Sequence, residues 1–159
     1  MIIRKAKRTD IDVLVNLLRG SFRGVAERFG VTEKNNPKFL AFCTNERIEN
    51  DLEKDLTYYI LVEDDLPCGC VALERTGTDV CYLMRLAVLP EHRGKGYGKM
   101  LVHHTFKKSL TYGARRVEIA MISKDRKLKR WYKKLGFIQK GTKKYDHLPF
   151  IVAFMYREL

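Results

Sequence analysis

The chain has 159 residues, of which 45% are hydrophobic and 31% are charged. This length and composition fit one compact domain spanning residues 1–159, and they exclude a collagen-like, disordered or disulfide-scaffold protein. The sequence contains 31 Lys and Arg residues against 19 Asp and Glu residues, a net charge of +12, which favours an anionic partner such as a nucleic acid or a nucleotide cofactor.

The first part of the chain is predicted to form a short strand, a long helix and an irregular segment. Residues 2–7 are typical of a strand, and Thr9 with Asp12 has the spacing of a capping box at a helix start. The helix is indicated by apolar residues at helical spacing, namely Ile11, Leu14, Val15, Leu18, Phe22 and Val25. Residues 31–55 predict a loop with one or two short helices.

The middle of the chain combines a hairpin with a strand–helix–strand unit. The apolar segments 57–62 and 68–74 predict the hairpin. Strand-like residues 80–89 precede a helical pattern over 94–112 and a further strand at 116–122. A strand–helix–strand succession requires a parallel pair, whereas a hairpin is antiparallel, so the predicted sheet is mixed.

The last part of the chain is predicted to add one more helix and two more strands. Residues 125–135 have the amphipathic pattern of a helix, and residues 137–144 and 150–156 are typical of two closing strands. The whole pattern predicts an α/β fold, a single domain with a mixed, twisted β-sheet and helices on both faces.

Four cysteines lie in apolar or strand-like stretches without CxxC spacing: Cys43, Cys68, Cys70 and Cys81. We expect them to be reduced and mostly buried, and we assign no metal site from the sequence. No segment approaches the roughly 20 apolar residues that a membrane span needs, and the charged start does not resemble a signal peptide. These features predict a cytoplasmic protein without a membrane partner.

The chemistry of the sequence is concentrated in residues 86–98, where a predicted buried strand ends at Pro90 and runs into a glycine-rich turn. The residues of this turn are Arg93, Gly94, Lys95, Gly96, Tyr97 and Gly98. Glycines allow close approach of a ligand, and free N–H groups at a helix start favour an anion such as a pyrophosphate. The spacing is neither the Rossmann fingerprint nor a P-loop, which would have Ser or Thr at Met100.

In this context the turn resembles the acyl-CoA loop of the GNAT family of N-acetyltransferases. That loop is written Arg/Gln-x-x-Gly-x-Gly/Ala and is matched by Arg93, Gly96 and Gly98. Residues 86–90 resemble the family's cofactor-binding strand, and the segment from Tyr132 to a Gly-Phe pair resembles its second landmark. The resemblance extends over almost the whole chain.

The resemblance implies an N-acetyltransferase that binds acetyl-CoA and passes its acetyl group directly to a primary amine. It places the pantetheine arm against the main chain of Leu86, Ala87 and Val88, and the pyrophosphate over residues 93–98. It also implies that Tyr132 is the general acid that returns a proton to the CoA thiolate, because a phenol is protonated at neutral pH.

Two positions depart from the family pattern. Asp125 stands where the family often has an asparagine that bonds the pantetheine, and an ionised Asp can only accept hydrogen bonds. Tyr82 stands near the position of the family's strand glutamate, which leaves the general base open, with Glu74 and Glu118 as candidates.

Helical spacing also places Tyr132 on a core-facing stripe, where packing alone would explain it.

No motif identifies the acceptor. His147, in the loop before the last strand, is either a substrate contact or a turn histidine. The missing strand carboxylate keeps a non-catalytic acyl-CoA-binding or sensing domain as an alternative, and the basic residues 124–134 keep a nucleic-acid-binding protein as another. Nucleic acid is disfavoured because no recognised motif accompanies that charge. We expect a small-molecule or protein amine as the partner, and the oligomeric state, a homodimer included, stays open.

Overall fold

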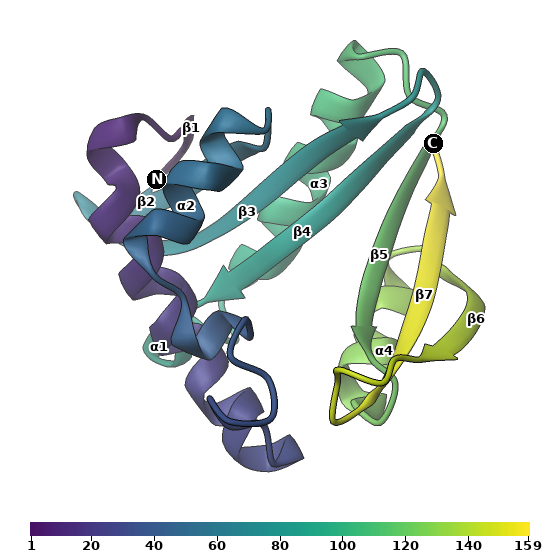
Figure 1. Ribbon diagram of the computed structural model, residues 1–159. Helices are drawn as coiled ribbons and strands as arrows, with labels where there is room; N and C mark the ends of the chain where they lie inside the picture. The colour runs from purple at the N-terminus through teal and green to yellow at the C-terminus, as the bar shows by residue number, and fades with distance from the viewer.

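A seven-stranded sheet in the order β1-β2-β3-β4-β5-β7-β6 forms the centre of the protein (Figure 1). This computed structural model describes residues 1–159. The strands are β1 (Ile2–Lys5), β2 (Thr57–Glu63), β3 (Leu66–Thr76), β4 (Val80–Val88), β5 (Arg116–Ile122), β6 (Ile138–Lys144) and β7 (Ile151–Glu158). The helices are α1 (Ile11–Phe29), α2 (Asn45–Glu53), α3 (Tyr97–Thr111) and α4 (Arg126–Lys134), with short 3-10 turns η1 (Arg8–Asp10), η2 (Leu40–Phe42) and η3 (Pro90–His92).

Helices cover both faces of the sheet. Side chains alternate between the two faces along each strand, so a buried strand presents apolar side chains to the helices on both sides. On β3, Cys70 and Ala72 pack with α1 and α2, whereas Val71 and Leu73 pack on the opposite face with α3 and α4. Only β4 and β5 pair in parallel, so the predicted mixed α/β fold is confirmed. None of the helices has the length and apolar character needed to cross a membrane.

The parallel pair β4–β5 holds together at one end only. Its register begins at the pair Val80–Arg116 and ends at the pair Tyr82–Glu118. Beyond Tyr82, β4 stays paired with β3, while β5 pairs along its whole length with β7. The sheet therefore opens into a V between β4 and β5 (Figure 1), and the last residues of β4 have no strand partner on that side.

A bulge in β4 marks the region where the strands diverge. The register with β3 shifts between Cys70 and Ala72, and Arg85 has a φ of +53° there. The Arg85 guanidinium donates hydrogen bonds of 2.8 and 3.1 Å to the Asp51 carboxylate on α2, which also accepts one of 2.6 Å from the Tyr58 hydroxyl. This ion pair is almost fully buried, and it holds Arg85 in its left-handed conformation by joining its side chain to α2.

The start of the first helix differs from the sequence prediction. The capping box at Thr9 is wrong, since α1 begins at Ile11 and Asp10 makes the local hydrogen bonds instead. Its carboxylate accepts two hydrogen bonds of 2.8 Å from the Arg4 guanidinium and one of 2.8 Å from the Lys7 amide. An ion pair to β1 therefore fixes the chain ahead of the helix.

Residues 94–96 of the glycine-rich turn lie outside the helix that was expected to include them. α3 begins at Tyr97, because Gly94 and Gly96 have φ values of +78° and +83°, which no right-handed helix contains. The four cysteines are free and buried, as expected.

The Arg4–Asp10 pair predicts a pH-dependent contribution to stability. Hydrogen bonding to Arg4 lowers the pKa of Asp10 from its usual 3.8 to about 2. A pKa that is lower in the folded state gives a contribution that is complete above about pH 4 and is lost as the pH falls toward the folded-state value.

We expect Asp10→Asn to lower the free energy of unfolding by about 1 kcal/mol at pH 7, since Arg4 is partly exposed and solvent weakens the pair. Urea unfolding at pH 7 and near pH 2 measures the difference from wild type, which should shrink toward zero at the acid end. Glu53→Gln is the control, because its pair with Arg8 is 3.7 Å long and exposed. An equal difference at both pH values contradicts the prediction.

Candidate active site

The turn between β4 and α3 presents a row of free backbone amides. The N–H groups of residues 94–98 donate no hydrogen bond to the backbone, and they lie at the start of α3. A Cβ atom added at Gly94 or Gly96 would meet no other protein atom within 4 Å, so open space borders the turn. Free amides at the positive end of a helix dipole, next to open space, fit a phosphate group.

Arg93 fixes the position of this turn. Its guanidinium donates one hydrogen bond of 2.9 Å to the Val88 carbonyl at the end of β4 and another of 2.9 Å to the Ser21 carbonyl in α1. Lys95 is exposed, and its ammonium lies 5.9 Å from the centre of the Tyr97 ring. Arg93 is thus engaged within the protein, whereas the charge of Lys95 faces solvent.

The third glycine of the motif is needed for packing. A Cβ atom at Gly98 would lie 3.2 Å from the Trp131 ring on α4. α3 and α4 therefore approach each other closely here, and any side chain at this position would push the Trp131 ring by a few tenths of an ångström.

The last residues of β4 direct their side chains away from the V. Leu86 and Val88 pack toward the α3 side of the sheet and Ala87 packs toward the α1 side, which leaves their main chain along the gap. Gly69 on β3 permits this path, since a Cβ atom there would lie 2.5 Å from the Ala87 carbonyl oxygen. The role of Gly69 was not predicted, because its only signal in the sequence is a glycine inside an apolar strand pattern.

Tyr132 lies on α4 in the core beneath α3, with 6% of its surface exposed. Its ring is in edge contact with Phe137 and Trp131, at centroid distances of 5.3 and 5.0 Å. Burial, reinforced by the nearby Asp125 charge, raises the pKa of Tyr132 above its usual value. The phenol is therefore protonated at neutral pH and can donate a proton.

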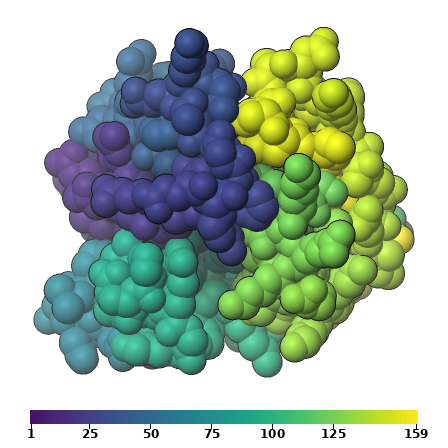
Figure 2. All heavy atoms as spheres, turned by 90° about the horizontal axis from the view of Figure 1, so that it is seen from below, coloured from purple at the N-terminus to yellow at the C-terminus, as the bar shows by residue number.

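Asp125 caps α4 and joins it to α1. One carboxylate oxygen accepts a hydrogen bond of 3.2 Å from the Leu128 amide, and the other accepts one of 3.3 Å from the Arg28 guanidinium. Figure 2 shows the end of α1 (dark blue) reaching α4 (light green) across this face of the molecule. Both oxygens of Asp125 are thus engaged within the protein.

Two carboxylates flank Tyr82 on the face of the sheet that α1 and α2 cover elsewhere. The strand register places Glu74 on β3 directly opposite Tyr82, and Glu118 on β5 opposite it on the other side. Glu118 is paired with Lys140 at 3.0 Å and with Arg116 at 3.7 Å, whereas Glu74 has no ion-pair partner. The structure thus places both candidate bases beside Tyr82, and they differ in that only Glu118 is engaged in ion pairs.

The loop before β7 lies close to the segment before α2. Phe150 in that loop has its ring 6.1 Å from Phe39, which lies 5.9 Å from Phe22 on α1. His147 is exposed in the same loop, 5.6 Å from the Tyr145 ring. The contact between Phe39 and Phe150 thus bridges the two halves of the split sheet, and the loop that carries Phe150 also carries the exposed His147.

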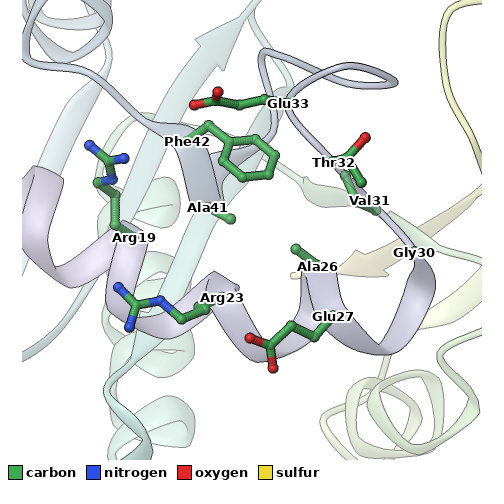
Figure 3. Close-up of a pocket in the computed structure, with 10 residues that line it drawn as sticks. All are labelled: Arg19, Arg23, Ala26, Glu27, Gly30, Val31, Thr32, Glu33, Ala41 and Phe42. Carbon is green, nitrogen blue, oxygen red and sulfur yellow. The ribbon is translucent and has the colours of Figure 1, made fainter.

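A separate hollow of about 560 Å³ lies between α1 and residues 30–42 (Figure 3). Arg19, Arg23 and Glu27 border it along the helix, and Phe42 and Glu33 border it from the loop. No residue of β4, of the amide turn or of α4 lines this hollow, so it is distinct from the V and the turn.

The turn of free amides lies at the carboxyl end of a split parallel strand pair, the place where open α/β sheets bind ligands such as nucleotide-type cofactors. Residues 14–137 match the model of the Acetyltransferase (GNAT) family, and the chain belongs to that family. The resemblance found in the sequence is confirmed: the protein is an acetyltransferase, with acetyl-CoA as donor and an amine as acceptor.

Solved acetyltransferases share the fold over nearly the whole chain. The PaiA N-acetyltransferase from Thermoplasma acidophilum, in complex with coenzyme A, is 19% identical with a TM-score of 0.84, covering 99% of this chain and 98% of that one. The ribosomal-protein-S18-alanine N-acetyltransferase from Escherichia coli is 12% identical with a TM-score of 0.78, covering 99% and 92%. The IAA acetyltransferase from Bacillus cereus is 16% identical with a TM-score of 0.71, covering 99% of both chains. A comparison with curated proteins gave no match.

The open amide turn predicts that a side chain at Gly96 blocks anion binding. We expect Gly96→Glu to weaken CoA binding by at least about tenfold, because its carboxylate would occupy the space beside the amides and repel phosphate. Gly77→Glu is the matched control, since Gly77 also has a left-handed φ and open surroundings but lies in the β3–β4 turn. Calorimetric titration with CoA measures both variants, and equal affinity for Gly96→Glu and wild type would overturn the assignment.

Proposed function

We propose that residues 94–98 hold the phosphates of acetyl-CoA and that its pantetheine arm lies in the V between β4 and β5. The observation that carries this proposal is the run of backbone amides without a partner beside a split parallel pair. Lys95 adds a solvent-facing positive charge at the turn. Along the V, the main chain of Leu86, Ala87 and Val88 offers N–H and C=O groups to the amides of the arm. The bound cofactor supplies an acetyl group activated as a thioester.

Arg93 and Asp125 support this site indirectly in our proposal. The hydrogen bonds of Arg93 to Val88 and Ser21 hold the amide turn against β4 and α1. The carboxylate of Asp125 is engaged by Leu128 and Arg28, so it positions the start of α4 rather than bonding the pantetheine.

Tyr132 acts as the general acid in the proposed mechanism. Its hydroxyl keeps its proton at neutral pH, because burial raises the pKa of the phenol. A thiolate that departs in an apolar site is poorly solvated, so a proton delivered to its sulfur lowers the barrier to its departure. Tyr132 lies on the α4 side of the V, within the core that also contains Leu86 and Val88.

Glu74 is the general base in this proposal. An amine that arrives as an ammonium must lose a proton before its lone pair can attack a carbonyl carbon. Glu74 is free to accept that proton, directly or through a water, whereas Glu118 is neutralised by two cations. The position of Glu74 opposite Tyr82 places it on the strand next to the one that usually carries a base in this family.

The acceptor enters between the segment before α2 and the loop that carries His147, according to our proposal. Phe39 and Phe150 border this route, and His147 is exposed beside it. The protein acts in the cytoplasm, a compartment that keeps its four free cysteines reduced. An acceptor screen begins with the classes that structurally similar enzymes are named for, an aminoglycoside and an alanine of a ribosomal protein. Acetyl-CoA binding without transfer to any amine would favour a sensing domain instead.

The proposed acid predicts a selective loss of turnover in Tyr132→Phe. We expect kcat to fall by about 100-fold or more, as is typical for removal of a general acid, while the CoA dissociation constant changes less than about twofold. Tyr112→Phe is the control, because Tyr112 lies at the C-terminal end of α3, whereas the amide turn lies at its N-terminal end. Steady-state kinetics with calorimetry separates the two effects, and unchanged turnover in Tyr132→Phe would refute the acid role.

The proposed base predicts unequal effects at the two carboxylates beside Tyr82. We expect Glu74→Gln to lower kcat/KM by about 100-fold at neutral pH, since the amide cannot accept the ammonium proton. Glu118→Gln removes a carboxylate of the same size and should change kcat/KM by less than about threefold. Acetyl transfer is followed by release of the CoA thiol. A larger loss in Glu118→Gln would assign the base to Glu118 and contradict the role of Glu74.

A further inference from the structure

Three side chains with metal-binding atoms meet beside the amide turn, outside the site described above. Glu63 ends β2, Cys68 lies near the start of β3, and His92 ends η3. A carboxylate oxygen, the thiol sulfur and an imidazole nitrogen all lie within 4.8 Å of one another. The β2–β3 hairpin supplies two of these groups, and the segment that leads into the turn supplies the third.

The surroundings of this cluster leave one of its groups without a partner. Cys68 is fully buried, and Glu63 and His92 are half-buried. The Nδ1 atom of His92 is buried and has no hydrogen-bond partner in the protein. Native proteins satisfy nearly all buried polar atoms, so a buried imidazole nitrogen without a partner calls for a further ligand, and the histidine that carries it lies beside a thiol and a carboxylate.

We propose that Glu63, Cys68 and His92 bind a zinc ion, with water in the fourth position. A thiolate, an imidazole and a carboxylate are the three donor types that zinc takes in proteins, and it prefers four tetrahedral ligands. Ligand atoms about 2.0–2.3 Å from a shared zinc lie roughly 3.3–3.8 Å apart in a tetrahedron. The observed separations of up to 4.8 Å would have to shorten by on the order of 1 Å to reach that geometry, a change of the size that side-chain rotation supplies.

The protein also places a group beside one of these ligands. Glu63 lies close to the Tyr97 hydroxyl, and this carboxylate raises the pKa of Tyr97 to about 12. The Cys68 thiol now donates to the Leu66 carbonyl over 3.2 Å, and zinc binding releases this thiol proton to solvent as the sulfur bonds as thiolate. In the metal-bound state only the phenol of Tyr97 is left to orient a ligand, through the Glu63 carboxylate, and outer groups of this kind are typical of zinc sites.

A zinc ion at this site would link the β2–β3 hairpin to the segment that leads into the amide turn. His92 directly precedes Arg93, so a metal that fixes His92 against β2 and β3 restrains the start of residues 93–98 from a second side. The ion takes no part in acetyl transfer, and its role is to order the turn. We therefore expect zinc to stabilise the fold and to tighten CoA binding modestly.

The test begins with the full chain stripped of metal by a chelator and titrated with Zn²⁺ and with Co²⁺. We expect one equivalent of Zn²⁺ to bind with a dissociation constant at or below about 1 µM and to raise the melting temperature by at least about 3 °C. Co²⁺ should give the charge-transfer absorption of a thiolate ligand, which reports Cys68 directly in the unaltered protein.

Matched variants distinguish this site from adventitious binding. Cys68→Ser and His92→Gln should each weaken Zn²⁺ binding by at least about 100-fold. Cys81→Ser removes another buried thiol, and His104→Gln removes another imidazole with a buried, unpartnered nitrogen, and both should bind zinc as wild type does. No thiolate absorption with Co²⁺ in wild type, or an equal loss in the control variants, would overturn the proposal. Because metal binding is measured without CoA, either outcome is independent of the proposed acetyl transfer.

Discussion

The divergence of β4 from β5 is the constraint on which the rest of the site depends. A left-handed residue such as Arg85 costs on the order of 1–3 kcal/mol in backbone strain. The buried pair with Asp51, supported by the Tyr58 hydroxyl, satisfies the guanidinium at that place. The bulge lies within β4 on the side paired with β3, so β4 can leave β5 without losing its other partner. The free main chain along the V is the consequence.

A sheet split in this way needs other contacts to hold its halves together. The parallel pairing joins them only from Val80 to Tyr82. The contact between Arg28 and Asp125 and the aromatic contact between Phe39 and Phe150 add bridges across the open end. All of these partners lie on helices and loops, which tolerate small movements better than a ladder of backbone hydrogen bonds. The V is therefore closed at one end by rigid pairing and at the other by adjustable side chains.

The sequence predicted the order of elements and the glycine-rich turn because both depend on local patterns. Periodicity identified the parallel unit around α3, and the alternating glycines marked the free amides. The close approach at Gly69, the engagement of both Asp125 oxygens and the cluster around Cys68 depend on contacts between segments far apart in the chain. The spacing of the cysteines gave no metal motif, since the hairpin and η3 bring the three ligands together only in the folded chain.

The proposed acid and base lie on opposite faces of the sheet, and the split between the strands is what makes this arrangement workable. Tyr132 belongs to the core beneath α3 and α4, while Glu74 and Tyr82 face the side on which α1 and α2 pack. In a continuous sheet, backbone hydrogen bonds would separate two such groups. Because β5 leaves β4 after Tyr82, a thioester in the gap is open to an amine from one face and to a proton donor from the other. In the proposed mechanism the amine loses its proton on the Glu74 side and the thiolate gains one on the Tyr132 side, so neither proton transfer obstructs the other.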